Sequence, residues 1–315
     1  MAGVSLCSSS NVSRRFDILT FPGGPFAAIA AEWRLAETLG FDGAFLVDTL
    51  AKPGFVDYEA WVTLAALARE TSRIRIGTLV TVLPLRHPAV LAAQASSVDR
   101  ISEGRLDLGI GVGDDPGDLA AVGVEPWPVG ERLERLAEQL AILDSSLRGG
   151  HSAHAGRFYR SDELHLALPV QRPRPPIIVA AQSSGSIALA ARFADGWNSL
   201  GGQPTAGSER ISLREAVAHT VKQVATLDAA CRAIGRDPAT VRRSVLAFRP
   251  ERDPLSSIEA FDEFVGRYAD VGIDGFTFYW PPLASLRRQE PVPHEARAAF
   301  ERIAAERVGR AGRRA

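Results

Sequence analysis

The chain has 315 residues, of which 46% are hydrophobic and 23% are charged, which is ordinary for a globular protein. Its 37 acidic and 36 basic residues nearly cancel, so no overall field favours nucleic acid or a membrane surface as a partner. The two cysteines, Cys7 and Cys231, belong to no CxxC or Cys/His pattern, so we expect neither a disulfide framework nor a metal site. Since no run of about 18 apolar residues and no signal-peptide pattern is present, the default expectation is a cytoplasmic protein.

After a small, polar N-terminal segment (1–15) that we expect to be disordered, apolar strands and amphipathic helices alternate along the chain. The expected strands are residues 16–21, 41–48, 74–82, 105–111, 177–181, 196–200, 241–248 and 274–280. The expected helices are residues 25–40, 57–71, 87–102, 129–147, 184–194, 212–235, 257–272 and 294–308, with Asp57 and Ser184 as candidate N-caps. Residues 309–315 form a basic C-terminal tail.

Eight strands that are each followed by a helix indicate parallel pairing, because parallel strands need crossover connections. The sequence therefore predicts an α/β protein with a TIM (β/α)8 barrel as a single domain over residues 16–308. An open, doubly wound sheet is the alternative. The rhythm breaks at about residues 114–175, which predicts an insertion after the fourth strand. Part of this insertion, which contains His151 and His154, is interpreted as a polar loop rather than a metal site.

In a TIM barrel the active site lies at the C-terminal ends of the strands, and here those ends are rich in Gly, Ser and aromatic residues. They are poor in His and Cys, which favours an enzyme whose bound cofactor supplies the chemistry. The stretch "AAQSSGS" runs from a strand into a helix, so Ser183, Ser184, Gly185 and Ser186 could bind a phosphate. The alternative is that Ser184 is there only to cap the N-terminus of the helix.

Other residues at these ends carry two interpretations each. Gly109, Gly111 and Gly113 either make a turn or allow something flat to approach the backbone. Asp48 and Asp114 are candidate acids or ordinary solvated residues, and His87 is a candidate base or a structural histidine. By composition, residues 79–82 are plain strand core.

Two long motifs in the chain resemble the luciferase-like flavin-dependent monooxygenase family, also called the bacterial luciferase superfamily. They are "GTLVTVLPLRHPAVLAAQASSVDRISEGRLDLGIGVG" (77–113) and "RPPIIVAAQSSGSIALAARFADGWN" (174–198), with weaker support from "AETLGFDGAFLVD" (36–48). The resemblance runs from about Phe16 to Asn198. It implies a TIM-like barrel whose C-terminal mouth binds either FMN or the 8-hydroxy-5-deazaflavin coenzyme F-420, of which we favour F-420.

The resemblance also implies roles for individual residues. Asp114 matches a position where deazaflavin dehydrogenases have a catalytic glutamate, and Asp48 matches an acid that contacts the pyrimidine end of the ring. With His87 they are the candidate catalytic residues, and a non-prolyl cis peptide between Leu79 and Val80 would lie behind the ring. The implied cofactor-binding residues are Asp48, Leu79, Val80, Gly111, Gly113, Ala180, Ala181, Gln182, Ser183, Ser184 and Gly185. No metal site is implied.

The sequence departs from the family pattern at two places: Thr49 stands where a histidine is common, and Gln182-Ser183 replaces a Gly-Gly or Gly-Ser pair. His87 or Asp114 could take over the role of the missing histidine. The expected reaction is hydride transfer between the ring and a small organic substrate. The alternatives are an FMN monooxygenase supplied by a separate flavin reductase, and a non-catalytic flavin-binding barrel. The family also implies a homodimer.

Overall fold

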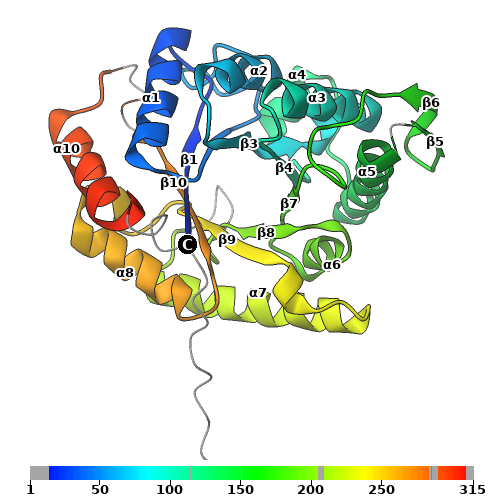
Figure 1. The fold of residues 1–315 in the computed structure, drawn as a ribbon. Coiled ribbons are helices and arrows are strands. Elements are labelled where there is room, and N and C mark those ends of the chain that lie inside the picture. Colours follow the sequence, from blue (N-terminus) through cyan, green and yellow to red (C-terminus); the bar gives the residue numbers. More distant parts are fainter. Residues whose placement is uncertain are drawn as a thin grey trace, which may run out of the picture.

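The computed structural model describes residues 14–113, 115–149, 151–204, 209–283, 285 and 290–309, and its centre is a closed barrel of eight parallel strands (Figure 1). The strands are β1 (Arg15–Thr20), β2 (Gly43–Leu46), β3 (Arg75–Val82), β4 (Leu106–Gly111), β7 (Ile177–Ala180), β8 (Gly196–Ser199), β9 (Arg242–Leu246) and β10 (Gly275–Tyr279). Because β1 pairs with both β2 and β10, the barrel is confirmed and the open sheet is excluded.

Helices surround the barrel and bury its outer face (Figure 1). They are α1 (Phe26–Leu39), α2 (Ala60–Glu70), α3 (Pro88–Ile101), α5 (Val129–Gly149), α6 (Ser184–Phe193), α7 (Leu213–Ala233), α8 (Ile258–Ala269) and α10 (His294–Ile303), which continues into the π-helical turn η4 (Ala304–Val308). Short 3-10 turns occur at η1 (Leu83–Leu85), η2 (Pro238–Thr240) and η3 (Pro254–Ser256). Strand side chains alternate, as expected: Ile18 packs under the helices, whereas Leu19 packs inside the barrel.

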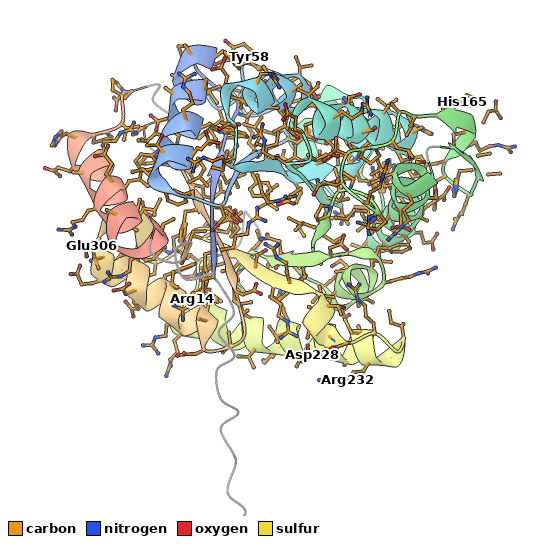
Figure 2. All side chains as sticks on the ribbon, in the orientation of Figure 1. Arg14, Tyr58, His165, Asp228, Arg232 and Glu306 are labelled. Atoms are coloured by element: carbon orange, nitrogen blue, oxygen red, sulfur yellow. The ribbon has the colours of Figure 1, made fainter. Side chains whose placement is uncertain are left out.

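The segment between β4 and β7 contains α4 (Pro116–Ala121), α5 and an antiparallel hairpin of β5 (His151–Ala155) and β6 (Arg160–His165). Helix α5 packs between α3 and α6, so it is the barrel's own fourth helix, and α4 and the hairpin are the added elements. The interpretation of the His151–His154 segment as a loop was therefore wrong. Figure 2 shows His165 on this hairpin at the edge of the molecule.

Three boundaries differ from the sequence expectation. Helix α2 is capped by Glu59, whose carboxylate accepts from the Val62 amide at 2.7 Å, and not by Asp57, which instead accepts from the Gly24 amide. Helix α6 is capped by Ser183, not by Ser184. Strand β1 starts at Arg15. Residues 1–13 and 310–315, where we expected tails, lie outside the described residues.

Strands β3 and β4 approach each other unusually closely. Their register shifts between Thr78 and Thr81, and the peptide bond between Leu79 and Val80 is cis, as expected from the resemblance. A Cβ atom on Gly109 would lie 2.0 Å from the Thr78 carbonyl oxygen, and one on Gly111 would lie 2.4 Å from the Val80 Cγ2 atom. Gly109 and Gly111 therefore make room for the bulge in the neighbouring strand, so here it is a strand that approaches their backbone closely.

We predict that Gly109→Ala lowers the free energy of unfolding by about 1–3 kcal/mol, because the added methyl group collides with a backbone oxygen that belongs to a strand. Urea denaturation of the purified variant measures this change. The matched control is Gly266→Ala in α8, where a Cβ atom meets nothing within 4 Å and where we expect a gain of about 0.5–1 kcal/mol. Equal effects of the two substitutions would contradict the close-packing explanation.

Candidate active site

The C-terminal mouth of the barrel is floored by apolar side chains. We call ten residues inside the barrel the lumen cluster: Leu19, Phe45, Val47, Leu79, Val80, Ile178, Leu200, Leu246, Phe248 and Tyr279. Val47, Val80, Leu200, Phe248 and Tyr279 are half-buried and lie at or just beyond the C-terminal ends of their strands. Apolar side chains at this end of the barrel suit a flat, largely apolar ring.

Asp48 follows β2 and is the acid that the sequence placed at the mouth. Its side chain has no exposed surface, and both of its oxygens are engaged by the Arg86 guanidinium, at 3.0 Å for the Nη2–Oδ1 contact. Arg86 also donates to Glu59, the cap of α2, at 2.9 Å. Burial raises the pKa of the Asp48 carboxyl above its usual value, although Arg86 opposes this shift. Asp48 as a ring contact or catalytic group stays a prediction, which this conformation does not display.

The residue that replaces the family histidine, Thr49, has a structural partner. Its hydroxyl donates to the Asp118 carboxylate at 2.8 Å, and the amides of Leu50 and Ala51 donate to the same oxygen at 2.6 and 3.0 Å. Lys52 extends this connection through an ion pair with Asp115 at 2.5 Å. The loop after β2 is thus fastened to α4, and Thr49 is not available as a base.

His87 caps α3 with its ring. The Nδ1 atom accepts the Ala89 amide at 3.1 Å, so the proton of the neutral ring lies on Nε2. The exposed ring also packs edge-on against Tyr159, with 5.5 Å between centroids. In this state Nε2 of His87 carries a hydrogen that is available for donation, and protonation of Nδ1 would break the cap. Its catalytic role stays a prediction, as does that of Asp114, which lies outside the described residues.

The turn from β7 into α6 places polar groups at the rim. The Ser183 side chain and Ser186 form a reciprocal capping box, while Ser183 and Ser184 are exposed. The amides of Ser184 and Gly185 make no hydrogen bond to another group in the described part of the chain, so both remain open at the helix N-terminus. A Cβ atom on Gly185 would lie 2.7 Å from the Leu133 Cδ1 atom of α5. Close packing against α5 therefore accounts for a glycine at this position.

Other predicted residues in this region have structural partners. The Gln182 side chain accepts from the Ser199 hydroxyl and the Leu200 amide at 3.3 and 3.2 Å. The Ala181 amide donates to Asn198 of the neighbouring strand at 3.0 Å, and Ala180 is the last residue of β7. Gly113 has a φ of 65°, which favours glycine at this turn. The cofactor-binding roles of all these residues stay predictions.

The structure adds three residues that the sequence interpretation missed: Arg86, Glu59 and Asp118. Arg86 is the sole charged side chain between β3 and α3 in "LPLRHP", which is a signal that a charged group is needed there. No comparable signal marks Asp118, because its partners lie 67–69 positions earlier in the chain.

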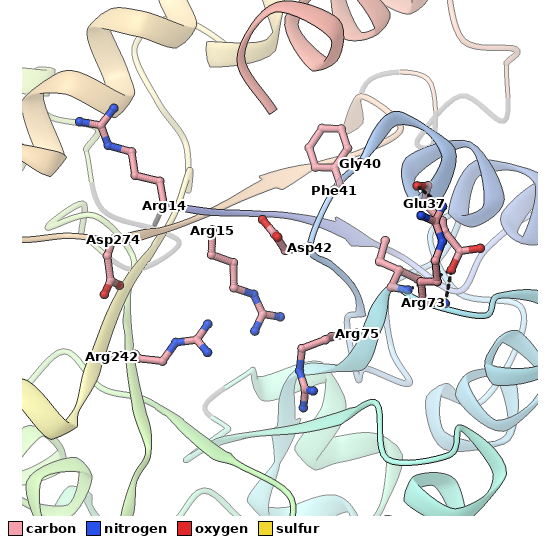
Figure 3. Close-up of a pocket in the computed structure, with 11 residues that line it drawn as sticks. Arg14, Arg15, Glu37, Gly40, Phe41, Asp42, Arg73, Arg75, Arg242 and Asp274 are labelled. Atoms are coloured by element: carbon pink, nitrogen blue, oxygen red, sulfur yellow. Dashed lines mark hydrogen bonds between the residues drawn. The ribbon is translucent and has the colours of Figure 1, made fainter. Parts of the chain in front are cut away.

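A cavity of about 640 Å³ lies at the opposite, N-terminal end of the barrel (Figure 3). Figure 3 shows the guanidinium ends of Arg15 and Arg242 turned toward each other. Its inner charges are compensated: Arg15 pairs with Asp17 and Asp107, and Arg75 pairs with Asp107. Since polar residues at this end of a TIM barrel stabilise the fold rather than catalyse, we place the candidate site at the mouth.

The described residues contain neither a metal-ligand cluster nor a membrane-spanning helix. Within these ranges no group of three or more His, Cys, Asp or Glu side chains could hold a metal ion. His154, one of the histidines noted in the sequence, instead contacts the Glu138 carboxylate at 2.9 Å. No helix in the same ranges is long and apolar enough to cross a membrane.

We predict that Arg86→Met lowers the free energy of unfolding by about 3–5 kcal/mol at pH 8, because it leaves the Asp48 carboxylate buried without its partner. Without Arg86 the pKa of Asp48 rises further. A raised folded-state pKa gives stability that is present at low pH and lost as the pH rises, so the deficit should be smaller at pH 5. Urea denaturation at the two pH values measures it.

Two controls separate this effect from simple loss of an arginine. Adding Asp48→Asn to Arg86→Met should recover part of the lost stability and remove the pH dependence. Arg34→Met, which breaks the exposed pair with Glu70, should cost less than about 1 kcal/mol. A deficit for Arg86→Met that matches that of Arg34→Met would show that the buried pair does not hold the mouth together.

Comparison with known proteins gives related sequences that include an F420-dependent dehydrogenase and a monooxygenase. The chain is 32% identical over 203 residues to the F420-dependent hydroxymycolic acid dehydrogenase of Mycobacterium tuberculosis, covering 64% of this chain and 52% of that protein. It is 34% identical over 172 residues to the pyrimidine monooxygenase RutA of Agrobacterium fabrum, covering 51% of this chain and 46% of that protein. The chain thus spans about half the length of these curated relatives.

Solved structures share the fold. The coenzyme F420-dependent tetrahydromethanopterin reductase of Methanopyrus kandleri has a TM-score of 0.73 at 15% identity, over 93% of this chain and 98% of that one. The monooxygenase RslO1 of Streptomyces bottropensis has a TM-score of 0.61 at 26% identity, over 92% of this chain and 88% of that one. The family model described as luciferase-like monooxygenase matches residues 11–278. The chain therefore belongs to the luciferase-like monooxygenase family.

Proposed function

We propose that this protein binds coenzyme F-420 at the mouth of its barrel and transfers hydride between the deazaflavin ring and a small organic substrate. The observation that carries the proposal is the pairing of a half-buried apolar floor with two open backbone amides at the N-terminus of α6. The F420-dependent dehydrogenase, which aligns with 64% of this chain, supports this choice of cofactor.

The residues present fit such a group at both of its ends. The amides of Ser184 and Gly185, with the positive end of the α6 dipole, would hold the phosphate. Val80 and Gly111 lie against each other beneath the mouth and would support the ring. When bound, the ring supplies the hydride chemistry. In the chain itself, the Nε2–H group of His87 could donate a hydrogen bond to a substrate oxygen while the proton stays on the ring.

The second candidate is an FMN-dependent monooxygenase that uses O2 and receives reduced flavin from a separate reductase. The similarity to RutA and to the monooxygenase RslO1 supports it. A third candidate is a flavin-binding barrel without catalysis. The engagement of Thr49 by Asp118, at the position where the family commonly has a histidine, favours this last one.

Titration of the purified chain with F-420 and with FMN, followed by cofactor fluorescence, decides among the three. We expect saturable binding of F-420 at nanomolar to micromolar dissociation constants and weaker binding of FMN. Tight binding of FMN with oxygen consumption in the presence of a flavin reductase would replace the first candidate with the second. Binding of either cofactor without turnover of any donor would favour the third, and binding of neither would contradict the proposal.

A substitution in the same titration tests the phosphate position. Ser184→Glu should weaken cofactor binding at least about tenfold, since it places a negative charge beside the phosphate. It should not lower the melting temperature, because a carboxylate in the first turn of α6 is favourable for the helix. Ala188→Glu adds the same charge to an exposed position one turn further along α6 and should change the affinity less than twofold.

We also propose a homodimer in which α2 and α3 contribute to the interface. These neighbouring helices expose two large apolar side chains, Val62 at 71% and Val90 at 51%. Light scattering should give about twice the chain mass of 33.8 kDa. The double substitution Val62→Lys with Val90→Lys should give a folded monomer, because it places charges on an apolar contact. A wild-type monomer would contradict this interface.

A further inference from the structure

Tyr279 occupies a particular position at the mouth. It is the last residue of β10 and lies beside Leu19 in the register of the barrel. Thr277 is buried two residues earlier in the same strand, while Phe276 and Phe278 pack outward under the helices. Alternation along the strand therefore turns Tyr279 into the barrel. Tyr279 adds a hydroxyl to the apolar side chains of the lumen cluster, while the polar side chains of Asp17 and Thr277 lie deeper on the same strands.

The Tyr279 hydroxyl forms no hydrogen bond to any residue that the structure describes. Tyr268 shows the usual arrangement, since its hydroxyl donates to the Gly201 carbonyl oxygen at 2.6 Å. Because Tyr279 is half-buried, its hydroxyl can meet water at the mouth and can exchange that water for a polar atom of a ligand. Burial also raises the pKa of Tyr279 well above its ordinary value, so the phenol keeps its proton throughout the physiological range.

The ring that carries this hydroxyl is held in place by aromatic neighbours. It stacks on Phe21 with an interplanar angle of 10° and 6.1 Å between centroids. Phe21 in turn packs against Phe55 in the loop after β2, at 4.9 Å. Because the stack fixes the phenol before any ligand arrives, a hydrogen bond from its oxygen carries little ordering cost.

We propose that the Tyr279 hydroxyl is the donor that binds the oxygen atom of the substrate, which we infer to be a small, mainly apolar molecule with one carbonyl or hydroxyl group. A hydroxyl set among apolar side chains orients a small ligand through the hydrogen bond that it donates. The inference rests on the proposed function for the identity of the site. It makes Tyr279 a specificity-determining residue that contacts the substrate and not the cofactor.

The experiment compares two ligands of the same shape, cyclohexanone and methylenecyclohexane, of which the ketone has a hydrogen-bond acceptor. Their dissociation constants are measured by saturation-transfer NMR on wild type and on Tyr279→Phe, with and without bound cofactor. Tyr279→Phe should lower the affinity for the ketone about 3- to 10-fold, which is the usual range for one hydrogen bond. It should change the affinity for the hydrocarbon less than twofold. Tyr268→Phe removes a hydroxyl elsewhere, so it should lower the melting temperature and leave both affinities unchanged.

Three results would overturn the inference. Tyr279→Phe could leave the affinity for the ketone unchanged, it could lower the affinities for both ligands equally, or wild type could show no measurable binding of the ketone. A loss of more than fivefold in the affinity for F-420 or FMN would assign the hydroxyl to the cofactor and would also overturn it. If wild type binds neither cofactor, the proposed function fails, whereas the comparison of the two ligands in the cofactor-free protein still decides the role of Tyr279.

Discussion

The close contact between β3 and β4 determines the shape of the candidate site. With no side chain on Gly109, the Thr78 carbonyl oxygen comes close to the β4 backbone, and the register shifts there. Strand side chains normally alternate between faces, yet Leu79 and Val80 are consecutive and both pack in the lumen cluster. Val80 then fills the space that a side chain at Gly111 would occupy. The apolar floor of the mouth is thus a consequence of two missing Cβ atoms in the neighbouring strand.

Buried charges fix the loops around this floor. The guanidinium of Arg86 joins Asp48, just after β2, to Glu59 at the start of α2. Asp118 accepts hydrogen bonds from one hydroxyl and two amides of the loop after β2. Such pairs add little net stability compared with apolar packing, since the desolvation of both charges opposes their attraction. Their benefit is positional, because a shift of these loops would leave the buried carboxylates of Asp48 and Asp118 without the partners they have here.

The barrel could be predicted from the sequence because each strand is a short apolar run between turn residues, and because eight such runs alternate with helices. The hairpin at residues 151–165 could not. Its segment has little apolar alternation, and its turn is held from outside by Glu138 of α5, which accepts the amides of Phe158 and Tyr159 at 3.1 and 2.8 Å. At the mouth, the sequence indicated which residues follow the strands. It did not indicate which of them pair with each other, because Asp48 and Arg86 are 38 positions apart and meet through the fold.

These pairings limit the chemistry that the chain can perform by itself. The candidate acid Asp48 is covered by Arg86, the hydroxyl of Thr49 is bound to Asp118, and Nδ1 of His87 accepts a helix amide. In the described part of the mouth, four of the polar groups named above have no partner and can donate a hydrogen bond. They are the amides of Ser184 and Gly185, Nε2 of His87 and the hydroxyl of Tyr279. A site that offers donors and no free base suits a bound ring that transfers the electrons itself. In the proposed arrangement, the chain would hold a phosphate at one side of the mouth and the oxygen of the substrate at the other.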